Sequence, residues 1–119
     1  MKANRTKRIC LTLDLREDPS LVQKYQEWHR PGRIWPEIPQ GIREVGILDM
    51  EIYLLGTRLF MILETETDFD FESRMEELSH LPKQHEWEEL MSAFQRATQG
   101  AGFSEKWARM ERIFKLPQL

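Results

Sequence analysis

The chain has 119 residues, of which 40% are hydrophobic and 10% aromatic, and its formal net charge at pH 7 is −3. This length predicts a single domain over residues 1–119, and the negative charge gives no general attraction to nucleic acid or anionic membranes. The lone cysteine, Cys10, cannot form an internal disulfide. No apolar run is long enough for a signal sequence or a membrane span, so we expect a soluble cytoplasmic protein.

The first two predicted elements are a strand and a helix. Apolar and polar residues alternate over residues 7–15, which predicts a strand with one buried face. Asp18 and Pro19 then suit the N-cap and the first position of a helix. Pro31-Gly32 ends that helix.

A second helix and a hairpin follow. Pro36 suits the first position of a helical segment, and Gly46 suits its C-terminal cap. Residues 47–55 and 58–65 are two β-prone runs joined around Gly56, which predicts a β-hairpin.

The last third of the chain predicts two helices and a closing strand. The spacing of apolar residues indicates helices over residues 69–81 and 83–99, separated by Pro82. Gly100-Ala101-Gly102 interrupts the pattern, and residues 107–116 are expected to form the last strand.

The resulting order is β-α-β-β-α-β, which is the ferredoxin-like arrangement of an α+β protein with an antiparallel sheet. Helices on one side of such a sheet leave the other face uncovered. Small sheets of this kind usually bury that face, often against a second copy, so we expect a homodimer.

His29 is the strongest candidate for proton transfer in the sequence. It lies four residues after Tyr25, so the imidazole and the phenol share one helix face. Histidine has the unperturbed pKa nearest to neutrality, and a loop with Trp35 and Glu37 follows. The alternative is that His29 is only a satisfied core or surface residue. For Trp35 the alternative is a helix start with a hydrophobic staple, and for Trp87 it is packing in the core.

Metal and phosphate motifs fail on spacing. His85 begins half of a zinc protease helix motif, but Glu89 stands where the second histidine is needed. His80 has no third ligand nearby. No glycine-rich phosphate loop is present, and we expect neither a metal nor a cofactor.

Six segments of the chain resemble the L-rhamnose mutarotase family, in order and approximate spacing, from about residue 8 to residue 117. Each segment alone is a weak signal, and their common order makes the resemblance specific. The segments are Tyr25-Gln26-Glu27-Trp28-His29, Ile34-Trp35-Pro36-Glu37-Ile38, Asp49-Met50-Glu51-Ile52-Tyr53-Leu54, Arg58-Leu59-Phe60-Met61, Glu86-Trp87-Glu88-Glu89-Leu90-Met91 and Ile113-Phe114-Lys115-Leu116.

The resemblance implies a fold, an activity and a set of site residues. The implied fold is a dimeric α+β barrel of ferredoxin-like subunits. His29 matches the proton-donating histidine of the family, and Tyr25 and Trp87 match positions that contact the sugar. Met50 and Glu86 stand at two further contact positions where the rhamnose-type pattern has other residues. Together with Glu105-Lys106-Trp107, these departures resemble the L-fucose branch of the family.

The implied reaction exchanges the anomers of a 6-deoxy-L-hexose without a cofactor. A positioned acid or base such as His29 serves both directions of ring opening. The apolar face of the sugar suits Trp87, Trp35 or Trp107, whereas the group opposite His29 is left open among Glu37, Asp49, Glu51, Glu86 and water.

Four other functions are alternatives to the mutarotation of L-fucose. One is L-rhamnose mutarotation, and another is a dimeric α+β barrel that senses a small molecule without catalysis. A monooxygenase is supported by fold analogy alone. RNA binding is disfavoured, because residues 58–63 do not supply the aromatics of an RNA-binding sheet.

Overall fold

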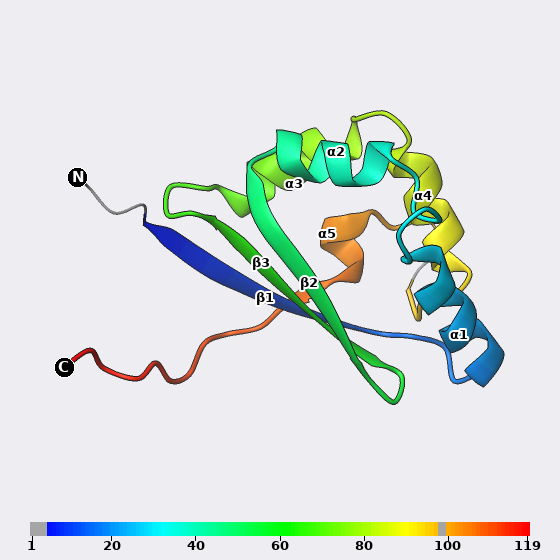
Figure 1. Ribbon diagram of the computed structural model, residues 1–119, viewed down its shortest axis with the longest axis horizontal. Coiled ribbons are helices and arrows are strands. Elements are labelled where there is room, and N and C mark those ends of the chain that lie inside the picture. Colours follow the sequence, from blue (N-terminus) through cyan, green and yellow to red (C-terminus); the bar gives the residue numbers. More distant parts are fainter. Residues whose placement is uncertain (1–4, 98–99) are drawn as a thin grey trace.

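A layer of helices covers one face of a four-stranded sheet (Figure 1). The computed structural model describes residues 5–97 and 100–119. The strands stand in the order β2-β3-β1-β4, and every neighbouring pair is antiparallel. The elements are β1 (Thr6–Asp14), α1 (Pro19–Trp28), α2 (Glu37–Glu44), β2 (Ile47–Leu55), β3 (Arg58–Glu66), α3 (Phe71–Ser79), α4 (Gln84–Ser92), α5 (Phe103–Lys106) and β4 (Ala108–Arg109). The predicted α+β class is confirmed.

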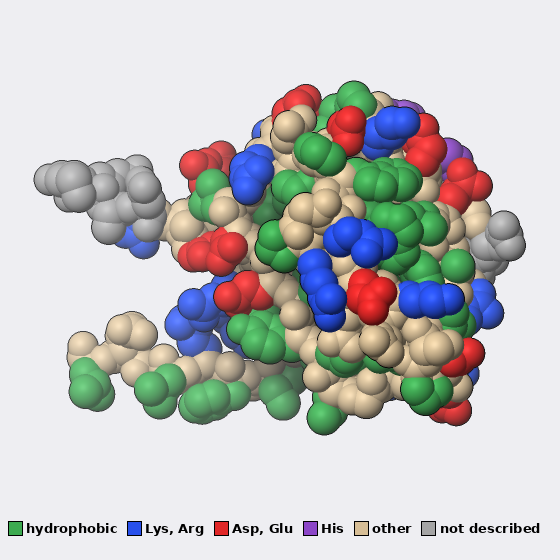
Figure 2. Space-filling model, turned by 45° about the vertical axis from the view of Figure 1, so that its right-hand side comes forward, with side chains coloured by type: hydrophobic (Ala, Val, Ile, Leu, Met, Phe, Trp, Pro, Cys, Tyr) green, Lys and Arg blue, Asp and Glu red, His purple; other side chains and the backbone are tan. Residues whose placement is uncertain are grey.

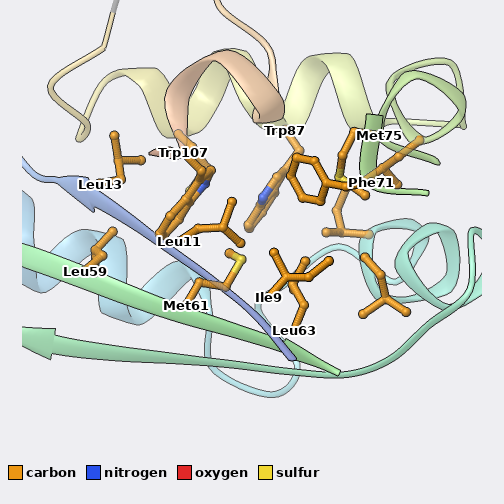
Figure 3. Close-up of a cluster of buried hydrophobic side chains, with 14 of the residues drawn as sticks. Ile9, Leu11, Leu13, Leu59, Met61, Leu63, Phe71, Met75, Trp87 and Trp107 are labelled. Carbon is orange, nitrogen blue, oxygen red and sulfur yellow. The ribbon is translucent and has the colours of Figure 1, made fainter. Parts of the chain in front are cut away.

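The core lies between the sheet and the helices. Alternate side chains of β1 point towards the helices, and their partners on β3 do the same, because side chains in a strand alternate between faces. Leu11 pairs with Met61, and Ile9 pairs with Leu63. All four are buried. In Figure 3 the ring of Trp107 comes down from the helical layer towards this apolar face of the sheet.

The helix boundaries near the N-terminus follow the predicted caps. The side chain of Asp18 accepts a hydrogen bond from the backbone N–H of Ser20 at 2.9 Å, and Pro19 opens α1. Helix α2 begins at Glu37, one residue later than predicted, because Pro36 is its N-cap residue and not its first helical residue. Gly46 ends this region with a φ of +96°, a conformation that side chains rarely adopt. Local chemistry therefore sets these ends.

The prediction of a helix over residues 83–99 is wrong in its second half. Helix α4 ends at Ser92, after which the chain turns and Gln95 pairs with Leu15 at the end of β1. This pairing satisfies backbone groups that a longer helix would have satisfied internally. The predicted residues 98–99 lie outside the described residues.

The prediction of a strand over residues 107–116 is also wrong. Strand β4 contains only Ala108 and Arg109, which pair with Thr12 and Leu11. Residues 110–119 have no regular structure and are exposed. They run away from the body, with hydrophobic side chains along them (Figures 1 and 2). The predicted strand therefore has a partner only at Ala108 and Arg109.

The second face of the sheet carries no helix (Figure 1). Side chains on this face include Cys10, Phe60 and Ile62, which are partly exposed, and Tyr53, which is 54% exposed. None of the helices in residues 5–97 and 100–119 is long and apolar enough to cross a membrane.

Candidate active site

A partly enclosed cavity lies between the helices and the inner face of the sheet. Four residues predicted for the site, Tyr25, His29, Met50 and Trp87, contribute to its wall. The cavity has a volume of about 60 Å³. A single buried water needs roughly 10–15 Å³ by the same measure, so the cavity holds more than one water.

His29 occupies the C-cap position of α1 and is half-buried. Its Nδ1 atom lies 2.8 Å from the backbone oxygen of Tyr25. A carbonyl oxygen only accepts hydrogen bonds, so Nδ1 is the donor and carries the hydrogen. The neutral ring therefore keeps its lone pair on Nε2.

Burial lowers the pKa of His29, and the hydrogen bond to the Tyr25 oxygen partly opposes this effect. Desolvation disfavours the charged imidazolium, so the ring is neutral at pH 7. A neutral histidine with a fixed tautomer can accept a proton at Nε2.

Aromatic rings hold the imidazole on two sides. The ring centroids of Tyr25 and His29 are 4.4 Å apart, and those of His29 and Trp87 are 5.4 Å apart with an interplanar angle of 72°. Trp35 packs edge-on against Trp87 at 5.3 Å. The first contact is local to α1, whereas the second joins α1 to α4.

The Tyr25 hydroxyl stays protonated. Burial raises the pKa of Tyr25, the nearby charge of Glu88 raises it further, and a hydrogen bond with the Gln95 side chain opposes the rise. A phenol in this state offers a hydrogen-bond donor and an acceptor oxygen, but not a phenolate.

A buried polar network lies on the α4 side of the cavity, and none of its residues is among the site residues predicted from the sequence. Gln84 donates a hydrogen bond to Glu88 Oε2 at 2.7 Å. Lys106 Nζ lies 3.1 Å from Glu88 Oε1 and 2.6 Å from the Glu88 backbone oxygen. Burial raises the pKa of Glu88, while Lys106 and then Gln84 hold it down.

Helical spacing could have revealed part of this network. Gln84, Glu88 and Met91 lie on the same face of α4 as Trp87, and all are buried. Lys106 could not have been found this way, since it belongs to α5. Gln95 was also missed, although it lines the cavity and is only 2% exposed.

The structure does not bring every predicted residue to the cavity. Glu86 is exposed on α4 and is not among the residues of the cavity wall, because it points away from the buried face. Three candidates for the group opposite His29 are absent from that wall too, namely Glu37, Asp49 and Glu51. Trp35 is also absent from that wall, and its ring packs edge-on against Trp87. Within the described residues, no three histidine, cysteine, aspartate or glutamate residues gather as a metal site would require.

Residues 8–116 match the protein family described as L-rhamnose mutarotase. The chain is also similar to an L-fucose mutarotase from Xanthomonas campestris pv. campestris, with 37% identity over 111 residues. That alignment covers 93% of this chain and 89% of the relative.

Two solved structures resemble the fold. The first is an L-rhamnose mutarotase from Formosa agariphila, with a TM-score of 0.69 and 18% sequence identity, covering 93% of this chain and 99% of the other. The second is tetracenomycin F2 cyclase from Streptomyces glaucescens, with a TM-score of 0.58 and 17% identity, and the same coverage of 93% and 99%. At these identities the likeness concerns the fold alone.

Proposed function

This chain belongs to the L-rhamnose mutarotase family, and from that premise we propose that it interconverts the α and β anomers of L-fucose in the cavity beside His29. Members of the family are isomerases, and the sugar mutarotase activity follows from membership. The choice of L-fucose rests on the 37% identical relative named for that sugar.

The observation that carries the proposal is the fixed tautomer of His29 at the cavity wall. Nε2 takes the proton of the anomeric hydroxyl, and the same proton passes to the ring oxygen as the bond between C1 and that oxygen breaks. The product is the open-chain aldehyde. Rotation about C1–C2 and the reverse transfers close the ring as the other anomer. One imidazole reaches both oxygens, because both are bonded to C1.

The apolar part of the cavity suits a 6-deoxy sugar. Trp87 and Met50 present an aromatic ring and a thioether to the space, and these surfaces match the methyl group and the C–H face of the sugar. The ring of Trp35 packs edge-on against the Trp87 ring and so stabilises its position. Tyr25 supplies a hydroxyl that binds a sugar oxygen.

The proposal is tested by replacing His29 and measuring anomer exchange by saturation-transfer NMR. We expect His29→Ala to lose roughly 10²- to 10⁴-fold in kcat/KM, the usual contribution of a positioned acid or base. His80→Ala is the matched control, because His80 is exposed and is not part of the cavity wall. Unchanged exchange in a folded His29→Ala variant contradicts the role of His29.

L-rhamnose is the second candidate substrate, because the matched family is described for it. The exchange rates of L-fucose, L-rhamnose and D-galactose, measured with the same wild-type protein, decide between them. We expect the highest kcat/KM for L-fucose. Tight sugar binding without any exchange would instead make the protein a sensor.

We also propose that the chain acts as a homodimer joined through the uncovered sheet face. That face carries Phe60, Ile62 and Tyr53, and the exposed side chains of Ile113 and Phe114 add further apolar area. Burial of such surface favours association.

A further inference from the structure

Gln95 carries the one buried side-chain nitrogen or oxygen atom in the described residues that has no hydrogen-bond partner. Its side-chain oxygen, Oε1, is buried and has no hydrogen-bond partner. The residue as a whole is 2% exposed and belongs to the cavity wall. A buried carbonyl oxygen without a donor costs free energy, so native structures rarely keep one without a reason.

The backbone around Gln95 is held firmly. Gln95 pairs with Leu15 beyond the end of β1. The backbone N–H of Arg96 donates to the Asp14 oxygen at 2.8 Å, and that of Arg16 donates to the Phe94 oxygen at 2.9 Å. The amide of Gln95 is thus carried by a paired segment and not by a free loop. Only its side-chain torsions remain adjustable.

The side chain of Gln95 also interacts with Tyr25, whose ring packs against His29. A hydrogen bond between the two side chains lowers the pKa of that phenol. Oε1 of Gln95 nevertheless has no partner. The last torsion of a glutamine side chain is soft, so the amide can adjust to a molecule in the cavity.

No donor in the described residues reaches Oε1. The missing donor must therefore come from the occupant of the cavity. A sugar hydroxyl is a donor of the right kind, since it can give a hydrogen to Oε1 while accepting one from a neighbour.

We propose that Gln95 is a specificity-determining residue, whose Oε1 accepts a hydrogen bond from one non-anomeric hydroxyl of the sugar. This inference rests on the proposed mutarotase function. It adds to that function the side chain that recognises one hydroxyl of the sugar by a hydrogen bond. A site built to bind a hydroxyl rejects the analogue that lacks it, because the buried oxygen is then left unpaired.

The test is Gln95→Met, which keeps the length of the side chain and removes the amide. We expect KM for L-fucose to rise by about tenfold or more, with kcat changed much less, because a ground-state hydrogen bond is lost. The melting temperature is measured beside KM, because the variant removes both a buried unpaired oxygen and the hydrogen bond with Tyr25. Gln40→Met, an exposed glutamine on α2, is the matched control and should leave KM unchanged.

The 2-, 3- and 4-deoxy derivatives of L-fucose identify the hydroxyl. Wild type should lose affinity for one of them, and Gln95→Met should bind that derivative and L-fucose equally well. Gln95→Asn, which draws the amide back by one methylene, should show the same loss if Gln95→Met fails to fold.

The outcomes separate the two proposals. Wild-type exchange together with an unaltered KM in a folded Gln95→Met variant overturns the role of Gln95 and leaves the mutarotase function standing. A fall in melting temperature without a change in KM also overturns it, because that is the behaviour of a purely structural glutamine. A wild-type protein that neither binds nor exchanges these sugars overturns both.

Discussion

At the scale of single residues, the chemistry of this protein depends on how one imidazole is held. The backbone oxygen of Tyr25 fixes the hydrogen on Nδ1 of His29, and burial lowers the pKa of the ring. Both effects keep the lone pair of Nε2 free at neutral pH. The ring is thereby prepared to take a proton before substrate binds, which is the part of the mechanism that local geometry controls.

This arrangement predicts the pH dependence of catalysis. We expect kcat/KM to stay constant around neutrality and to fall as the pH drops through a value below 6.5, the ordinary pKa of histidine. Protonation of Nε2 removes the base and explains the fall. Rates measured by saturation-transfer NMR, with the uncatalysed exchange subtracted at each pH, check this. An apparent pKa above 6.5 would contradict the neutral, buried ring.

The same lowered pKa makes a contribution to stability with a definite sign. Between 6.5 and the lower pKa of the folded state, unfolded chains bind more protons at His29 than folded chains do. The free energy of unfolding must therefore decrease as the pH falls through that window, and it levels off below the folded pKa. Urea unfolding of wild type and His29→Gln at several pH values isolates the contribution of His29 to this pH dependence.

At the scale of elements, the buried pair of Glu88 and Lys106 ties α5 to α4. Lys106 Nζ contacts both the carboxylate and the backbone oxygen of Glu88, and both residues are buried. Since α5 has only four residues, it needs such a tertiary anchor. The pair therefore positions Trp107, which follows α5 directly and lines the cavity.

We predict that Lys106→Met destabilises the protein by about 3–5 kcal/mol, because it leaves the Glu88 carboxylate buried without its cation. Adding Glu88→Gln should restore part of the loss. The measurement is urea unfolding followed by tryptophan fluorescence. Arg74→Ala, which breaks the exposed pair with Glu77, is the control and should cost less than about 1 kcal/mol. An equally small loss for Lys106→Met would show that the pair contributes little.

At the scale of the whole molecule, one face of the sheet is covered by helices and the other is not (Figure 1). The uncovered face has partly exposed Phe60 next to Tyr53 of β2. The segment after β4 carries further exposed apolar side chains (Figure 2). A single chain thus leaves these apolar side chains in contact with water, which favours self-association.

We predict that the protein sediments at twice the 14.3 kDa of its chain, and that Phe60→Glu shifts it to the monomer. A charge placed in an apolar interface costs more than it does in water, so it opposes association. Lys24→Glu on the exposed side of α1 is the control. A wild-type monomer at micromolar concentration would contradict the dimer.

The sequence by itself determined the local features of this protein. Alternation predicted β1, two β-prone runs around Gly56 predicted β2 and β3, and the Asp18 cap predicted the start of α1. Helical spacing placed His29 beside Tyr25. These features depend on residues within a few positions of one another, so a short window contains their cause.

Only the tertiary structure decided what surrounds that pair. It brought Trp87 against His29, placed Glu88 and not Glu86 at the cavity, and left Gln95 with an unpaired oxygen. It also reduced the last strand to two residues. Each of these outcomes depends on partners far along the chain, such as Lys106 for Glu88 and Leu15 for Gln95, and no local pattern encodes a contact whose other half lies in a distant element.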